Sequence, residues 1–173
     1  MTRAFEANSS KTTGTEQDGY RGDTAARAVG ISYRQLNYWA STTLVVPSIG
    51  EAFGPGTERR YSFGDLVLLK VVKRLLDAGV SLQNIRKAIE TLRSRGVEDL
   101  AGITLISDGT TVYECRSPEE VVDLLQRGQG VFGIAIGGAS KEIHGSLTNL
   151  PAEPAEPGAG DELVARRARR RAG

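Results

Sequence analysis

Cysteine, histidine and long apolar segments are nearly absent from this sequence. One cysteine, Cys115, and one histidine, His144, occur among 173 residues. A single cysteine excludes an intramolecular disulfide and a cysteine-rich metal site. No apolar run reaches the roughly 20 residues of a membrane-spanning helix, and residues 1–14 lack the apolar core of a secretory signal. We therefore expect a cytoplasmic protein with no membrane partner.

Side chains suited to catalysis or cofactor binding are equally scarce. We expect His144 to be structural and Cys115 to be a buried thiol; a redox or metal sensor at Cys115 is an alternative that no second cysteine or nearby histidine supports. The GIAIGG run at 133–138 lacks the Gly-Lys-Ser/Thr ending of a phosphate loop. Glu119 and Glu120 suit the first turn of a helix better than acid–base catalysis. The sequence predicts no enzyme, no cofactor and no metal site.

Charge is unevenly distributed although the net charge is only +1. Residues 20–95 contain 12 basic and 6 acidic side chains, whereas residues 96–150 contain 3 basic and 8 acidic ones. A basic segment suits a polyanionic partner, because each phosphate contact releases counterions. The alternative is an ordinary solvated surface, and charge alone does not decide between the two.

Composition divides the chain into four parts and predicts an α+β fold. Residues 1–19 are expected to be a disordered tail, and residues 151–173 a disordered tail with a basic end. Between them, residues 20–95 show helical periodicity. Residues 100–150 form a small α/β module, which is near the lower size limit for a stable core. We expect this module to pack on the first segment or on a second copy.

Helix caps and breakers mark the elements of both segments. Helices are predicted at 22–29, 33–40, 62–78 and 82–95, with Pro- and Gly-rich hairpin sequence at 44–62. In the module we predict strands at 103–106 and 111–115 around an Asp-Gly turn, then a helix at 118–127. A strand at 131–136, a turn at Gly137-Gly138 and a last strand at 143–147 complete the prediction.

The run from Asp23 to Ala40 has the anatomy of a helix-turn-helix. Two short helices meet at Gly30-Ile31-Ser32, and Leu36 points toward the small apolar face of the first helix. The second helix then presents five polar side chains outward, where arginine can pair with guanine, asparagine and glutamine with adenine, and tyrosine with phosphate. These residues are Tyr33, Arg34, Gln35, Asn37 and Tyr38. A helical hairpin with an ordinary polar face is the alternative.

The order of motifs resembles the MerR family of bacterial regulators. The matching pieces are GIS at 30–32, LNYWA at 36–40, LVVP at 44–47, ERRYS at 58–62, Asp65 to Leu69 and GVSLQNI at 79–85. The resemblance implies a winged helix-turn-helix that binds double-stranded promoter DNA at the nucleoid. The second half is similar, more weakly, to actinobacterial MerR-like regulators linked to growth or cell division.

The same resemblance assigns roles to the exposed residues. Tyr38, Arg59 and Arg60 resemble the family's contacts to the DNA backbone, and Tyr33 and Arg34 its base-proximal residues. Asn37 stands where the family usually has arginine, so a phosphate clamp is lost or moves to Arg34. Trp39-Ala40 replace Tyr-Glu, the wing loop is longer than usual, and Tyr61 resembles a packing position under the wing.

We therefore expect a homodimeric transcription factor on an inverted repeat, with RNA polymerase as a further candidate partner. Because the usual long dimerisation helix is missing, dimerisation is assigned to Ser81–Arg95 and the 100–150 module. Two alternatives stay open: a ligand-sensing regulator with a pocket in the module, and a protein-interaction adaptor that does not bind DNA. Only Asn37 in place of arginine favours the adaptor.

Overall fold

Helices dominate the first half of the computed structural model, which describes residues 19–50, 59–127 and 132–150. The elements are α2 (Gly22–Val29), α3 (Tyr33–Ser41), α4 (Phe63–Asp77) and α5 (Leu82–Arg93). Each of the last three begins after a serine whose hydroxyl accepts a backbone N–H of the first turn. The four helices predicted from the sequence are confirmed.

A sharp turn and a short strand pair fix how the first helices meet. Gly30 adopts φ 78°, and the N–H groups of Gly30 and Ile31 both donate to the carbonyl of Ala26 at 2.9 and 3.0 Å. β1 (Tyr20–Arg21) pairs antiparallel with β2 (Arg60–Tyr61), and Gly50 bridges to the other edge of Arg60. The base of the expected wing hairpin is thus present, whereas residues 51–58 of its loop lie outside the described residues.

The second half contains a small antiparallel sheet flanked by helices. Its elements are α6 (Val97–Ala101), β3 (Thr104–Ser107), β4 (Val112–Cys115), α7 (Pro118–Gln126), β5 (Phe132–Ala135) and α8 (Ile136–Asn149). The strand order is β4-β3-β5. The Asp-Gly hairpin, the helix after it and the strand near 131–136 are confirmed, and Cys115 is buried as expected. The described strands and helices agree with the α+β class.

The predicted end of the module is wrong. Gly137-Gly138 form no turn and 143–147 form no strand, because α8 runs through both and also contains His144. Packing accounts for the first of these two glycines: a Cβ added to Gly137 would lie 2.7 Å from the carbonyl oxygen of Ala101, whereas one added to Gly138 would meet nothing within 4 Å. Close packing against α6 requires a residue without a side chain, and this tertiary contact outweighs the low helix propensity of glycine.

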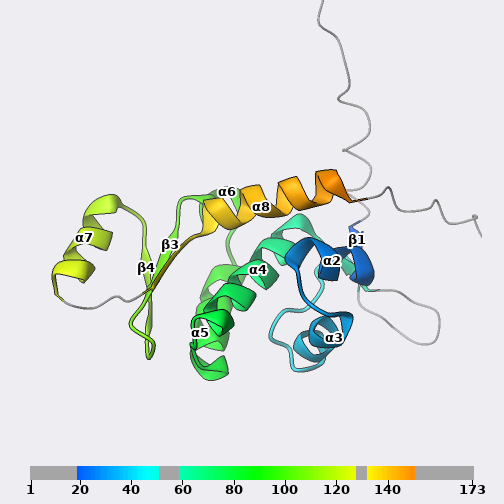
Figure 1. Ribbon diagram of the computed structural model, residues 1–173, viewed down its shortest axis with the longest axis horizontal. Coiled ribbons are helices and arrows are strands. Elements are labelled where there is room, and N and C mark those ends of the chain that lie inside the picture. The colour runs from blue at the N-terminus through cyan, green and yellow to red at the C-terminus, as the bar shows by residue number, and fades with distance from the viewer. Residues whose placement is uncertain (1–18, 51–58, 128–131, 151–173) are drawn as a thin grey trace, which may run out of the picture.

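One hydrophobic core runs through both halves of the structure. α8 lies along α4 and α2 (Figure 1), where it buries Ile136, Ala139 and Ile143. Glu142 of α8 pairs with Arg74 and, at 3.5 Å, with Lys70 of α4. Of the two expected alternatives, packing of the module on the first segment is therefore observed. The proposed division into domains stays a prediction.

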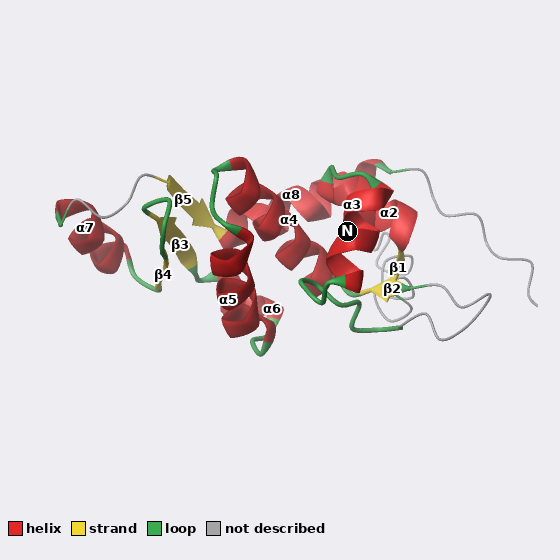
Figure 2. Cartoon of the chain, turned by 90° about the horizontal axis from the view of Figure 1, so that it is seen from below, coloured by secondary structure: helices red, strands yellow, loops and turns green. Residues whose placement is uncertain are grey.

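The body is elongated, with the helix-turn-helix at one end and α7 at the other (Figure 2). The sheet and α5 lie between these ends. No described helix is long and apolar enough to cross a membrane. Of the two expected tails, 1–19 and 151–173, residues 1–18 and 151–173 lie outside the described residues, whereas Gly19 is described and buried.

Candidate nucleic-acid interface

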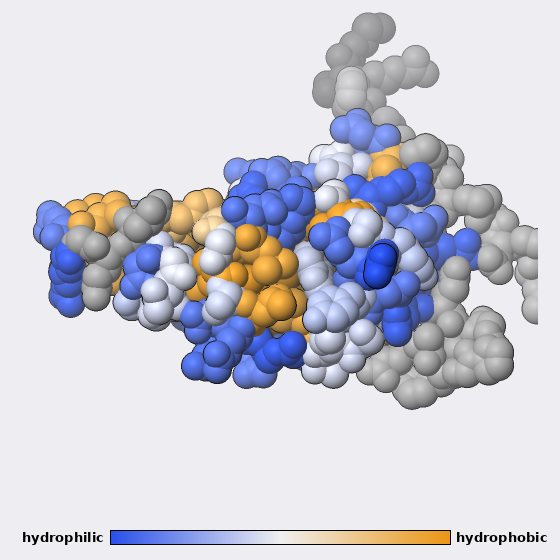
Figure 3. All heavy atoms as spheres, turned by 60° about the horizontal axis from the view of Figure 1, so that its bottom comes forward, coloured by the Kyte–Doolittle hydropathy of each residue, from blue (hydrophilic) through white to orange (hydrophobic). Residues whose placement is uncertain are grey.

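Helix α3 turns one face to the core and another to solvent. Leu36 and Trp39 are buried, whereas Tyr33 and Tyr38 are 56% and 55% exposed. Arg34 lies on the same exposed side, and no carboxylate among the described residues pairs with it. Figure 3 turns the α3 side toward the viewer and shows a largely hydrophilic surface there. Tyr33, Arg34 and Tyr38 therefore stand where the sequence placed them.

Ser41 extends this exposed face and was not among the residues predicted from the sequence. It follows Tyr38 by three residues and Arg34 by seven, so all three lie on one side of the helix. Its side chain is exposed, and its hydroxyl donates to the carbonyl of Tyr38 at 3.0 Å. Helical spacing from Arg34 was the signal that would have found it.

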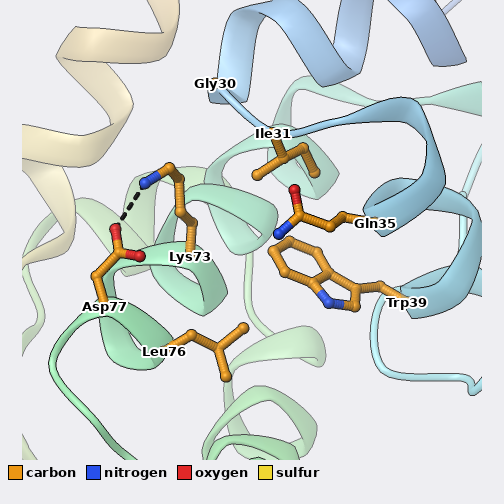
Figure 4. A pocket seen from close by; sticks show the side chains of 7 residues that line it. All are labelled: Gly30, Ile31, Gln35, Trp39, Lys73, Leu76 and Asp77. Atoms are coloured by element: carbon orange, nitrogen blue, oxygen red, sulfur yellow. Dashed lines mark hydrogen bonds and ion pairs between the residues drawn. The ribbon is translucent and has the colours of Figure 1, made fainter.

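Gln35 lies on a different side of α3 from Arg34. Its Oε1 accepts from Ser32 N–H at 3.0 Å and closes the capping box at the start of the helix. Its side chain faces α4 in a pocket of about 250 Å³, where Trp39 lies opposite Lys73 and Asp77 (Figure 4). The residue that the sequence assigned to base recognition thus has a structural bond and borders a pocket.

Asn37 is bonded to the base of the wing. Its Oδ1 accepts a hydrogen bond of 2.7 Å from Nη1 of Arg59, the residue directly before β2. Both side chains are half-buried. This bond brings together two residues that the sequence assigned to separate contacts, 22 positions apart.

Tyr33 packs on the first residue of α2. A Cβ added to Gly22 would lie 2.8 Å from Cε2 of the Tyr33 ring, so only glycine leaves the ring in this position. The ring is nevertheless more than half exposed. Gly22 therefore helps to set the direction of an exposed aromatic side chain.

The wing base is held to α4 by a buried carboxylate. Oδ2 of Asp65 accepts from Ser48 N–H, Ser48 Oγ and Ser62 N–H, each at 2.8 Å. Asp65 is only 7% exposed. Because Ser48 precedes the Gly50 bridge and Ser62 follows β2, this one side chain joins both arms of the wing base to the helix that supports them.

Tyr61 lies beneath this surface as a packing residue. It is 1% exposed, and its hydroxyl has no hydrogen-bond partner among the described residues. Burial raises the pKa of Tyr61 to about 12, against the smaller opposing effect of the nearby Arg59 cation. The predicted packing role fits this environment.

Comparison with known proteins identifies the family. The description MerR HTH family regulatory protein matches residues 20–92, which include α2, α3, the wing base, α4 and most of α5. HTH-type transcriptional regulators of Mycobacterium bovis and of two Mycobacterium tuberculosis strains are 60% identical over 157 residues, which cover 88% of this chain and 70% of each relative. The chain belongs to the MerR HTH family.

Several basic residues of this MerR-family head have internal roles. Arg86 donates to the carbonyl of Thr42 at 2.7 Å, and Arg93 to that of Leu44 at 2.9 Å, so both brace the segment after α3. Lys70 donates to the carbonyl of Val29 at the end of α2. The charge surplus of residues 20–95 therefore overstates the number of cations at the candidate interface.

The described residues contain no group of three or more side chains suited to a metal ion.

Proposed function

We propose that the chain is a sequence-specific, DNA-binding transcriptional regulator that binds an inverted-repeat promoter site as a homodimer at the nucleoid. The observation that carries the proposal is the exposed face of α3 beside the wing base. Tyr33, Arg34 and Tyr38 face solvent on the helix that the MerR HTH match includes. A polar helix face free of core contacts fits the major groove of a duplex.

The residues proposed to contact DNA have chemistries that suit different parts of the duplex; among them, Arg60 is half-buried. The guanidinium of Arg34, which no carboxylate of the described residues pairs with, can donate two bonds to a guanine edge. Tyr38 and Arg60 suit phosphate oxygens on either side of the groove. Arg60 lies in β2 opposite Arg21 of β1, so two cationic side chains occupy adjacent positions of this ribbon. The relatives' name, HTH-type transcriptional regulator, agrees with this assignment.

Titration of purified protein against a selected duplex tests the proposal. Arg34→Ala should weaken binding by about tenfold or more and reduce discrimination between sequences, since one bidentate base contact contributes about 1–3 kcal/mol. Arg60→Ala should weaken all sequences alike and reduce the slope of log K against log salt by about 0.9. Lys141→Ala is the matched control, because this exposed lysine lies on α8. Equal effects of all three variants would refute the interface.

The homodimer part of the proposal is assigned to the α7 end. α7 has no buried residue, and its Val122 and Leu125 are 50% and 52% exposed at spacing i, i+3. β5 is an edge strand, with Phe132 37% exposed. The outer side of α5 is polar apart from Leu82, so it offers less apolar surface than first expected. An inverted repeat requires a two-fold partner, and this end offers exposed apolar side chains that a second copy would bury.

Sedimentation velocity tests the dimer. The double change Val122→Asp and Leu125→Asp should convert the dimer to a monomer, because it places two charges in the proposed interface. The chain should stay folded, since neither side chain is part of its buried core. Leu82→Asp on α5 is the matched control, equally apolar and 41% exposed. A wild-type monomer at micromolar concentration, with and without DNA, would refute the dimer. Dissociation by Leu82→Asp alone would move the interface to α5.

A ligand-sensing regulator is the second candidate, and the pocket between α3 and α4 favours it. The sequence suggested a pocket in the second half, whereas this pocket lies in the head beside Gly30 and Trp39. A ligand there would touch the helix that faces DNA. A thermal-shift screen of metabolites with wild type and Trp39→Phe would detect such a ligand.

An adaptor without DNA binding is the remaining alternative. The titration of wild type and Arg34→Ala with DNA distinguishes it, because an adaptor would bind no duplex.

A further inference from the structure

The bond between Asn37 and Arg59 joins the two elements that would contact DNA. Asn37 lies in the middle of α3, and Arg59 lies directly before β2 at the exit of the wing. The guanidinium has only donors, so the amide oxygen of Asn37 must face it, as the 2.7 Å bond between Oδ1 and Nη1 shows. A side chain bonded in this way is not free to present the paired donor and acceptor that adenine recognition requires.

We propose that Asn37 is a positioning residue for DNA binding, which holds the Arg59 guanidinium at the wing base and reads no base itself. This inference rests on the proposed function. The bond uses one of the five N–H donors of Arg59, so the others stay available to a phosphate. Arg59 loses rotamer freedom before DNA arrives, and binding is spared that entropy cost.

The neutral amide is the important chemical feature of position 37. Arginine, the residue that the family pattern has here, would bring a second cation close to Arg59 and repel it, and a carboxylate would neutralise it. Asparagine orients the cation and leaves its full charge for the DNA backbone. Asn37 therefore replaces the charged side chain of the family pattern with a neutral one, which supports the contact of Arg59 with DNA.

A double-mutant cycle on DNA affinity tests this role. Asn37→Ala should weaken binding by about two- to tenfold, the cost of ordering one long side chain on binding, and leave both the salt slope and the sequence preference unchanged. Arg59→Ala should reduce the slope by about 0.9. Adding Asn37→Ala to Arg59→Ala should have no further effect. A loss that persists without Arg59, or that depends on the base sequence, would overturn the proposal in favour of base reading.

Asn37→Asp provides the conservative variant. Its carboxylate keeps Arg59 in place but neutralises it, so DNA affinity should fall below that of Asn37→Ala while thermal stability is retained. If Asn37 only supported the fold, Asn37→Asp would restore binding to the wild-type level. That result would also overturn the proposal.

Rotation of the Arg59 guanidinium in the free protein separates this inference from the proposed function. Nitrogen-15 NMR should show slow rotation in wild type, faster rotation in Asn37→Ala and slow rotation again in Asn37→Asp. Equal rotation in all three would refute the positioning role even if DNA binds. Slow rotation in a protein that binds no duplex would refute the proposed function and the role of Asn37 in DNA binding. Only the hydrogen bond between Asn37 and Arg59 would then be supported.

Discussion

Replacement of Asp65 by alanine should destabilise the fold more than loss of any exposed carboxylate. Its Oδ2 accepts three hydrogen bonds of 2.8 Å, two of them from the backbone N–H groups of Ser48 and Ser62. With Asp65 only 7% exposed, alanine leaves the two backbone N–H donors unpaired, at roughly 1 kcal/mol each. The Ser48 hydroxyl keeps a partner, because it also lies 2.9 Å from Ser62 Oγ. Loss of the acid at the third position of α4 adds about 0.5 kcal/mol. We expect a total of about 2–3 kcal/mol.

Urea denaturation followed by circular dichroism measures this change as a difference in free energy of unfolding. Asp65→Asn keeps the shape and one acceptor oxygen, so it should fall between wild type and Asp65→Ala. Asp23→Ala is the matched control, since Asp23 also lies in the first turn of a helix but is 67% exposed, 3.7 Å from Arg27. It should cost less than about 1 kcal/mol. Equal losses for Asp65→Ala and Asp23→Ala would refute the argument.

Three further substitutions test individual contacts. Asp108→Asn should destabilise the hairpin at neutral pH. Hydrogen bonds from backbone N–H groups, that of Thr111 first, lower the pKa of Asp108 below its ordinary 3.8. The stabilisation is therefore present above about pH 3.8 and disappears as the pH falls through the lowered pKa, which an acid titration of both proteins would show. Tyr61→Phe should leave stability equal or up to about 1 kcal/mol higher, because the hydroxyl is unpaired among the described residues. It should also remove the loss that wild type undergoes from pH 10 to about 12, as alkaline denaturation would reveal. Gly22→Ala should displace the Tyr33 ring and change DNA affinity while the melting temperature is kept; an unchanged affinity would contradict the role of that contact.

Local signals in the sequence predicted most of the first half and the hairpin of the second. Capping residues such as Ser32 and Ser62, and the Asp108-Gly109 turn, act within a few residues of the chain, so their effect is readable without a partner surface. α8 was missed because its start follows a β-prone run and contains two glycines. The apolar spacing of Ile136, Ala139 and Ile143 was present, but the contact with α6 that favours glycine at 137 is tertiary.

The candidate interface was predicted in part. Tyr33, Arg34 and Tyr38 face solvent as helical periodicity implied. The Ser32–Gln35 spacing predicted the capping box that Gln35 closes, and the structure confirms it; helical periodicity could not reveal that the Gln35 side chain faces α4. Nor could it reveal the bond between Asn37 and Arg59, because the partners are 22 residues apart and meet only when the wing base folds onto α3.

Genome-wide mapping of bound DNA, with wild type and Arg34→Ala compared in the same cells, tests the central claim most directly. We predict that wild type occupies promoters with an inverted repeat whose half-sites are about one helical turn, roughly 10 base pairs, apart. Arg34→Ala should lose this motif while the protein remains folded and present at the same level. Absence of any enriched motif for wild type, or identical occupancy by Arg34→Ala, would contradict recognition of DNA through the exposed face of α3.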